Sequence, residues 1–461
     1  MDRASAALLQ DTEPASAPRP VLSVWSATMI TVGIVIGAGI FQTPSLVANI
    51  AGSGAWMMAA WVLGGMLSLI GALTYAELAS THPSAGGDYT FLTRAYGKNL
   101  SFLFAWARSL VICTGSIALI GFILGDYLTR LWSLGPYSSA IYAAGAVIVL
   151  TAVNLLGLRE SARVQSVLTV LEIAGVLLVA LAGALFGSRG TEEVAAAAPS
   201  AGAGALGLAM VFVLLTYGGW NDAAYISAEV RGGPRAILKT LVGSIAIITT
   251  VYVCFVGAIW YALGFEGLKA SEAVGVDVME GIFGPLGGQL IGMIVAISAL
   301  TSMNSTMIVG ARTNYSVACD WPMFAFMGEW RGERNLPIVG FIVQTAITLA
   351  LIAFGAVEKD GFTTMVEFTA PVFWFFFMLS GISLFVLRRK HPNLPRPFSV
   401  PLYPIVPAIF VCTCAYLLYS SITYAQSQRA GYVAIAVVAA GAVVLGAMKI
   451  SARGAHSGME N

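Results

Sequence analysis

Long apolar runs alternate with short polar segments over almost the whole chain. Each run is long enough, at about 20 residues or more, to cross the hydrocarbon core of a membrane as a helix. The predicted spans lie at 22–50, 54–80, 99–131, 138–157, 162–187, 205–229, 236–263, 281–317, 336–356, 363–387, 401–424 and 430–449. The pattern therefore predicts an all-α integral membrane fold with about 12 transmembrane helices. The segment 84–98 is too polar to cross and is expected to form a short amphipathic or re-entrant piece.

In the first and sixth spans, glycines near the middle are interpreted as helix breaks, because each glycine weakens a helix by about 1 kcal/mol relative to alanine. The first span holds Gly33, Gly37 and Gly39, and the sixth holds Gly218 and Gly219. The sixth span lies five spans after the first and therefore runs in the opposite direction. Interrupted helices at matching places in two such units are typical of inverted-repeat transporters. For the first span alone, helix packing through the small residues Gly33 and Gly37 is an equally good explanation.

An interrupted helix exposes backbone groups that a continuous one pairs internally. In the first span, amides near Ala38, Gly39 and Ile40 would favour an anion. Carbonyls at the end of the preceding half-helix, and their counterparts in the sixth span, would favour a cation. A ligand with a carboxylate and an amine on one carbon, an α-amino acid, fits both. The predicted substrate-binding residues are Ile34, Val35, Gly37, Ala38, Gly39, Ile40, Leu215, Thr216, Tyr217, Gly218, Trp220 and Asn221.

Composition agrees with a membrane protein and narrows the possible partners. Hydrophobic residues make up 58% and charged residues 10% of the chain, whereas soluble domains have about 25% charged residues. A formal net charge of +1 indicates no nucleic-acid partner. The five cysteines lie in or beside apolar spans without metal-like spacing, so neither a metal nor a cofactor is predicted.

The distribution of Lys and Arg predicts the orientation in the membrane. If the amino terminus is cytoplasmic, most of the 24 Lys and Arg residues fall on cytoplasmic segments, so both termini are expected there. A plasma membrane, and more specifically a bacterial inner membrane, is the expected location. The predicted segments are a disordered cytoplasmic tail at 1–20, a first inverted repeat at 21–190, a second at 205–390, two further spans at 400–450 and a cytoplasmic tail at 451–461.

Five motifs in order give the chain a family resemblance. It resembles the amino acid–polyamine–organocation (APC) superfamily, and within it most closely the L-type amino acid transporter branch. The motifs are Gly33-x-x-x-Gly37-Ala38-Gly39-Ile40-Phe41, Tyr75-Ala76-Glu77-Leu78 followed by Pro83-Ser84-Ala85-Gly86-Gly87-Asp88-Tyr89, Ser161-Ala162-Arg163-Val164-Gln165, Tyr217-Gly218-Gly219-Trp220-Asn221 and Pro234-Arg235-Ala236-Ile237.

The resemblance implies a LeuT-like five-plus-five inverted repeat with broken helices 1 and 6 and two further helices. It also implies secondary active transport of an amino acid, expected to be neutral, by alternating access. Two residues depart from the family pattern. Ala38 stands where many relatives have serine, and Leu215 where L-type relatives often have phenylalanine. The loop 131–138 lacks the cysteine that joins eukaryotic relatives to a heavy chain, so no disulfide-linked partner is expected.

Glu172 is the candidate coupling residue. A helix that starts near Ser161 carries it about 16 Å deep, near the middle of the membrane. Ionisable groups at that depth are costly, and they often belong to proton relays. Relatives of the L-type branch often have lysine at this place, so the hypothesis here is proton coupling. The alternative is a hydrogen-bonded glutamic acid that only joins helices.

Other charged residues have structural explanations. Arg108 lies inside the third span, where it could face the cytoplasmic vestibule, pair with an acid, or extend to the interface. Asp222 suits the amino terminus of the half-helix after the break. Glu77 and Glu229, near cytoplasmic span ends, are expected to form ion pairs at an inner gate.

Several alternatives to uptake stay open. An amino acid exchanger or a polyamine carrier is compatible with the same architecture, and a polyamine carrier would need carboxylates facing its pocket. A membrane-embedded enzyme is disfavoured because no nucleophile motif or His/Cys/Asp cluster occurs at membrane depth. A sensor is disfavoured because the loops are short and no soluble output domain is present.

Overall fold

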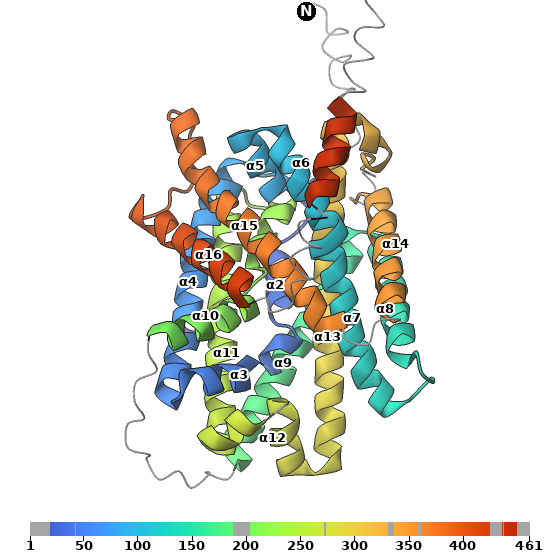
Figure 1. Ribbon diagram of the computed structural model, residues 1–461, viewed down its shortest axis with the longest axis vertical. Helices are drawn as coiled ribbons and strands as arrows, with labels where there is room; N and C mark the ends of the chain where they lie inside the picture. The colour runs from blue at the N-terminus through green and yellow to red at the C-terminus, as the bar shows by residue number, and fades with distance from the viewer. Residues whose placement is uncertain are drawn as a thin grey trace, which may run out of the picture.

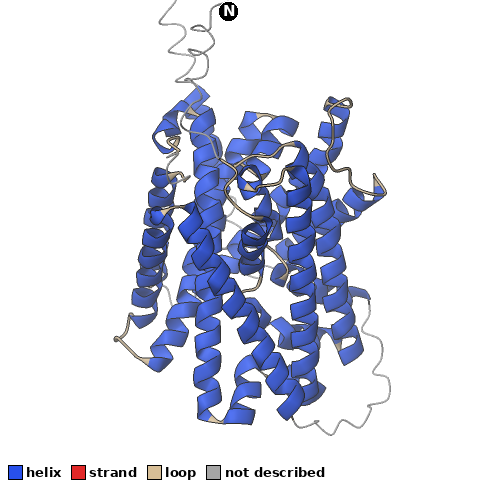
Figure 2. Cartoon of the chain, turned by 180° about the vertical axis from the view of Figure 1, so that it is seen from behind, coloured by secondary structure: helices blue, strands red, loops and turns tan. Residues whose placement is uncertain are grey.

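A computed structural model describes residues 19–41, 43–187, 203–271, 273–330, 336–356, 361–424, 436 and 438–449. Over these residues the chain is almost entirely helical, and the helices stand side by side as one bundle (Figure 2). Eight of the described helices are long and apolar enough to cross a membrane, and shorter apolar helices accompany them. The predicted all-α membrane fold is therefore confirmed.

The first half of the chain follows the predicted spans closely, with its first span divided in two. The short helix α5 forms where a non-crossing segment was expected. The elements are α2 (Val24–Val35), η1 (Ala38–Phe41), α3 (Thr43–Ala51), α4 (Gly54–Thr81), α5 (Asp88–Tyr96), α6 (Lys98–Ala107), the π-helical turn η2 (Arg108–Ile112), α7 (Cys113–Leu131), α8 (Ser138–Leu156) and α9 (Leu158–Phe186).

The second half repeats the pattern with a divided sixth span. Its elements are α10 (Ala203–Thr216), η3 (Trp220–Glu229), α11 (Pro234–Ala270), α12 (Val274–Phe283), α13 (Pro285–Asp320), η4 (Pro322–Met327), α14 (Ile338–Gly355), α15 (Gly361–Lys390) and α16 (Ile405–Tyr424), followed by the apolar helix Val438–Lys449. The predicted limits of the two repeats remain an expectation.

The predicted eighth span includes the end of a separate helix. The eighth span was expected to begin at residue 281, but a separate helix, α12, ends at Phe283, and the spanning helix α13 begins at Pro285. Gly284 between them has φ +61°, a conformation that glycine adopts without steric cost. Proline at the next position suits the first turn of a helix, because its missing amide hydrogen has no partner to lose there.

Both predicted helix breaks are present. α2 ends at Val35, and the chain turns through Ile36 and Gly37 before η1. α10 ends at Thr216, and Gly219, with φ +106°, redirects the chain into η3. In Figure 1, α2 stands at the centre of the bundle, while α3 lies across the bundle below it. The first interruption therefore lies near the centre of the bundle.

The position of α2 depends on the small size of Gly33. The helix packs against α9, α11 and α13. A methyl group at Gly33 would collide with the side chains of Gln165, Thr169 and Thr301. Small residues are the usual means by which membrane helices approach each other this closely. Gly33 is therefore a packing glycine, which the sequence alone offered as one of two explanations.

Gly33→Ala is expected to lower stability by about 1–3 kcal/mol, because the added methyl group overpacks the contact with α9 and α13. Thermal unfolding in detergent measures the change. Gly145→Ala is the matched control, since a methyl group at Gly145 in α8 meets open space. The control should be neutral or stabilise by up to about 1 kcal/mol. Equal effects of the two substitutions would contradict the close approach at Gly33.

Candidate functional site

The two helix breaks meet at the centre of the bundle. Gly219 faces the side chain of Ile34 so closely that a Cβ atom would lie 2.6 Å from Ile34 Cγ2. The hydroxyl oxygen of Tyr252, on α11, lies 2.8 Å from the carbonyl oxygen of Val35 and 3.1 Å from that of Thr216. One phenol therefore joins the ends of both interrupted half-helices.

A second hydroxyl joins the first break to α13. Ser302 Oγ lies 3.0 Å from the carbonyl oxygen of Gly33 and 3.3 Å from that of Ile36. The sequence predicted free carbonyls near Ile34 and Val35, but Val35 already accepts from Tyr252, so that part of the expectation is corrected. A carbonyl oxygen has two lone pairs, so these groups keep the capacity to accept a further bond from an ammonium group.

The amides after the break remain available. Gly37 is half-buried and Gly39 is exposed. Within the described parts of the chain, no acceptor is found for the amide of either glycine. The amide of Ile40 was also expected to be free, but it donates to the carbonyl of Gly37 at 3.3 Å, and its side chain is fully buried. The amides that could bind an anion are therefore those of the segment 37–39.

The predicted residues of the sixth span divide into two groups. Leu215 is 43% exposed, Gly218 is half-buried, and Thr216 Oγ1 lies 2.9 Å from Thr43 Oγ1, which joins α10 to α3. Tyr217 and Trp220 are buried. The first donates its hydroxyl to the carbonyl of Trp61, and the second packs against Tyr75, Phe377 and Phe410. Their side chains belong to the packing around the breaks.

Asn221 is buried beside the breaks with part of its hydrogen-bonding capacity unused. Its side chain is 2% exposed, and Nδ2 lies 3.4 Å from Asp222 Oδ1. Among the described residues, the side-chain carbonyl oxygen has no donor. A buried acceptor without a donor costs about 1–3 kcal/mol, so a ligand that donates to it would be favoured.

Glu172 is fully buried on α9. Its Oε1 accepts from the hydroxyl of Ser298 at 2.5 Å, and its Oε2 has no partner within the described residues. Ser298 and Ser302 lie four residues apart on α13 and therefore on one face of that helix. Since Ser302 contacts the first break, one helix face connects Glu172 to it.

Ser302 and Tyr252 were missed by the sequence analysis. Asn304, on the same helix as Ser302, bonds Gln165 and Asn154 and thereby joins α13 to α9 and α8. Ser302 lies 269 residues from Gly33 in the chain, so the sequence held no signal for their contact. Tyr252 had no signal either, because it lies in an ordinary apolar span.

Known proteins resemble this chain over most of its length. A sequence profile of the amino acid permease family, part of the APC superfamily, matches residues 22–446. The chain belongs to this family. The permease is 24% identical to the serine/threonine exchanger SteT of Bacillus subtilis over 399 residues, covering 86% of this chain and 90% of the exchanger.

Two mammalian proteins show similar likeness to the permease. The cystine/glutamate transporter of Homo sapiens is 27% identical over 400 residues, covering 85% of this chain and 78% of the transporter. The large neutral amino acids transporter small subunit 2 of Mus musculus is 28% identical over 407 residues, covering 86% and 75%. These relatives are transporters or exchangers, and the permease is not an enzyme.

Several contacts join helices at the end of the permease that is predicted to be cytoplasmic, called the basic end below because most Lys and Arg residues are assigned to it. The amides of Val21 and Leu22, before α2, donate to the carbonyl of Glu229 at 2.9 and 2.8 Å. The side chains of Glu229 and Arg312 form a fully buried ion pair, with 2.5 Å between Oε1 and Nε. The predicted pairing of Glu229 is confirmed, and it joins η3 to α13.

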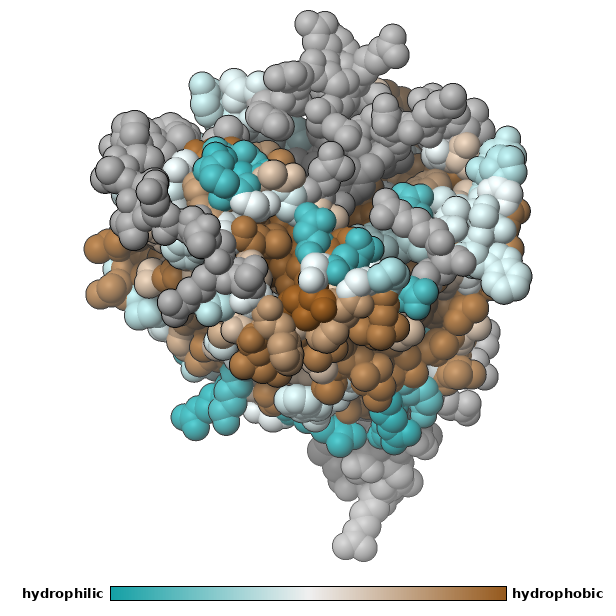
Figure 3. All heavy atoms as spheres, turned by 90° about the horizontal axis from the view of Figure 1, so that it is seen from below, coloured by the Kyte–Doolittle hydropathy of each residue, from teal (hydrophilic) through white to brown (hydrophobic). Residues whose placement is uncertain are grey.

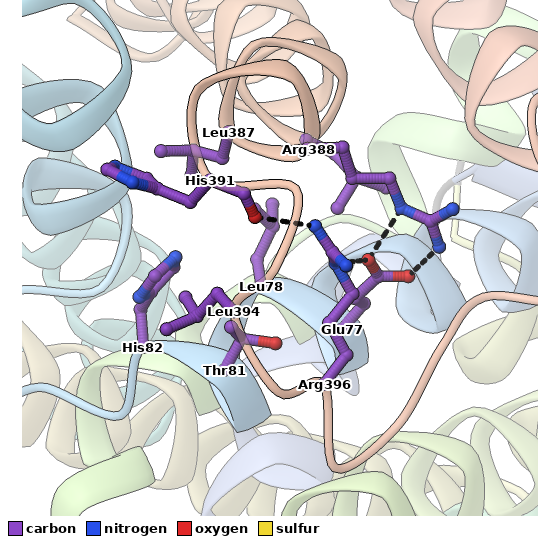
Figure 4. A pocket seen from close by; sticks show the side chains of 10 residues that line it. Glu77, Leu78, Thr81, His82, Leu387, Arg388, His391, Leu394 and Arg396 are labelled. Atoms are coloured by element: carbon purple, nitrogen blue, oxygen red, sulfur yellow. Dashed lines mark hydrogen bonds and ion pairs between the residues drawn. The ribbon is translucent and has the colours of Figure 1, made fainter.

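Glu77 lines a small pocket at the same end (Figure 4). Arg388 binds its two carboxylate oxygens at 2.8 and 2.6 Å, and Arg396 lies 3.4 Å away. This confirms the expected ion pair of Glu77. In the same pocket, His82 Nδ1 lies 2.7 Å from Arg94 Nη1. The guanidinium only donates, so His82 accepts here and is neutral.

Burial and the nearby positive groups, including Arg94, lower the pKa of His82 to about 4. An unfolded chain has a histidine pKa of about 6.5, so this contact contributes stability above that pH and loses it as the pH falls towards 4. Thermal unfolding in detergent should show this loss in the unmodified protein. His82→Gln keeps an acceptor for Arg94 without titrating and should flatten the slope between about pH 6.5 and 4. If the stability of His82→Gln depends on pH as that of the unmodified protein does, His82 is not the group responsible.

Proposed function

We propose that the permease is a secondary active transporter that binds a zwitterionic α-amino acid between its two helix breaks and moves it by alternating access. The meeting of these breaks carries the proposal. It places the amides of Gly37 and Gly39, for which the described residues provide no acceptor, near the carbonyls of Val35 and Thr216. Amides favour a carboxylate and carbonyls favour an ammonium group, so the backbone suits the part common to all α-amino acids.

A neutral side chain is the proposed preference. Of the two acids nearest the breaks, Asp222 is paired with Arg108 and Glu172 is bonded to Ser298. The charge of Asp222 is matched by that of Arg108, so Asp222 offers no free charge that would select a cationic side chain. The same observation makes a polyamine substrate the weaker alternative. Exchange of amino acids remains the main alternative to net uptake, because the relative SteT is named an exchanger.

The proposed transport cycle starts from a form closed at the basic end. Contacts of Val21, Leu22 and Arg312 with Glu229 close that end, while Gly39 and Leu215 beside the breaks are exposed. This combination suits a form that takes up substrate from the opposite side. We assign the basic end and both termini to the cytoplasm, and the plasma membrane, specifically a bacterial inner membrane, as the location.

Proton coupling through Glu172 is the proposed driving mechanism. A carboxyl group buried at membrane depth with one oxygen unpaired is suited to gain and lose a proton. Its bond to Ser298 places it on the face of α13 that also contacts the first break through Ser302. A change of charge at Glu172 would therefore act on the helix that holds the break.

Glu172→Gln is expected to abolish uphill amino acid uptake driven by a pH gradient in proteoliposomes. Exchange against amino acid inside the vesicles should persist, because counterflow needs no net proton movement. Glu160→Gln, at the exposed start of the same helix, is the matched control and should leave both activities unchanged. Undiminished pH-driven uptake by Glu172→Gln would rule out the coupling role.

Gly39→Val is expected to abolish uptake while the protein still inserts and folds. A Cβ atom at Gly39 would lie 3.8 Å from Thr216 Cγ2, an ordinary contact, so the fold has room for a side chain. The added methyl groups would instead occupy the space beside the free amides. Gly39→Ala should retain part of the uptake. Normal transport by the valine variant, measured with equal amounts of folded protein, would leave the first break with only a packing role.

A further inference from the structure

A buried ion pair connects the third span to the sixth between the helix breaks and the basic end. Arg108 and Asp222 are 3% and 7% exposed, and Arg108 Nη2 lies 2.8 Å from Asp222 Oδ1. Arg108 begins the π-helical turn η2, and Asp222 lies in the first turn of η3. Short π-helical segments inside α-helices frequently mark functional positions.

Arg108 holds η3 through more than one contact. Its guanidinium carbon lies 4.0 Å from the centre of the Tyr225 ring, and its Nε lies 3.2 Å from Thr313 Oγ1 on α13. The hydroxyl of Tyr225 donates to Asp88, at the start of α5, at 2.9 Å. Arg108 therefore contacts two side chains of η3 and ties them to α13, while Asp88 holds the same half-helix from another side.

The location gives these contacts a consequence for transport. η3 begins at the second break and ends at Glu229, where the chain before α2 closes the basic end. If η3 moves relative to η2 and α13, a path from the breaks to that end can open. Such a movement separates Arg108 from Asp222 and Thr313 and exposes both charges to the entering water.

The stability of a buried ion pair depends on whether one partner or both partners are removed. Removal of one partner leaves an uncompensated buried charge, which is strongly destabilising, whereas removal of both partners is often nearly neutral. In the open form, water would hydrate whichever charge remains. Loss of one partner therefore penalises the closed form more than the open form.

We propose that Arg108 and Asp222 form a latch that positions η3 and sets the balance between the forms closed and open at the basic end. This inference rests on the proposed transport function, because it assigns a role within alternating access. Arg108 acts as a positioning residue, since it holds the half-helix and does not contact the proposed substrate. The pair is separate from the proton-coupling role of Glu172.

Two native cysteines allow the latch to be tested without substrate. Cys113, which directly follows η2, is 4% exposed, and its amide donates to the carbonyl of Arg108. Cys414, on α16, is 1% exposed. Chains that keep only one of these cysteines, the others being replaced by alanine, would be purified in detergent and labelled with a water-soluble maleimide. Labelling of Cys113 reports opening beside the latch, and labelling of Cys414 reports general unfolding.

Asp222→Asn should raise the rate of Cys113 labelling by about tenfold or more and leave Cys414 unchanged, because a guanidinium cannot shed its charge. Arg108→Met should give a smaller increase, since a lone carboxyl group can take up a proton. The double variant Arg108→Met/Asp222→Asn should return Cys113 labelling towards that of the unmodified protein. Glu266→Gln is the matched control, because it removes one partner of the exposed pair with Lys269, and it should change neither rate.

Three outcomes would overturn the latch. They are unchanged Cys113 labelling in Asp222→Asn, parallel increases at Cys113 and Cys414, and a double variant that labels at least as fast as Asp222→Asn. If Asp222→Asn does not fold, the comparison of Arg108→Met with the double variant decides between the same outcomes. Amino acid uptake by the unmodified protein is measured separately, so a failure of the proposed function would appear there and not in the labelling.

Discussion

Backbone amides and carbonyls have no water to bond in the hydrocarbon core, so any interruption of a membrane helix must be supplied with partners by the rest of the protein. This permease interrupts two helices at its centre, after Val35 and after Thr216. The surrounding bundle supplies those partners unevenly. Carbonyls on one side receive hydroxyl donors from α11 and α13, whereas the amides of Gly37 and Gly39 find no acceptor among the described residues. The amides that lack an acceptor are the groups proposed to bind the carboxylate of the substrate.

Ionisable groups in the hydrocarbon core also need partners, and an unpaired charge there costs more free energy than an unpaired backbone group. Glu229 is paired with Arg312 and Glu77 with Arg388, and both pairs join helices at the basic end of the bundle. The described part of α9 contains one carboxyl group, Glu172, that has only a serine for a partner. A buried carboxyl group with an unpaired oxygen is suited to bind and release a proton. The carboxylates in ion pairs instead hold helices together.

Much of the architecture could be predicted because membrane spans are encoded locally. Apolar runs give the span limits, and the glycines at 33–39 and 218–219 indicate both breaks. The separation of α12 from α13 at Gly284 was missed, because the apolar pattern continues across a turn that depends on one positive φ angle. Trp220 was predicted to bind substrate, but its ring packs against Tyr75 and Phe377, and the sequence holds no signal for the direction of a side chain.

The sequence by itself determined the membrane class, the interrupted spans, the family resemblance and the presence of Glu172 at membrane depth. These properties depend on residues that are neighbours in the chain. Only the tertiary structure decided which orphan carbonyls are satisfied, because Tyr252 and Ser302 reach them from distant spans. It also decided that Arg108, from the third span, meets Asp222 in the sixth. Pairing across the bundle depends on how helices are rotated and offset, which local hydrophobic patterns do not specify.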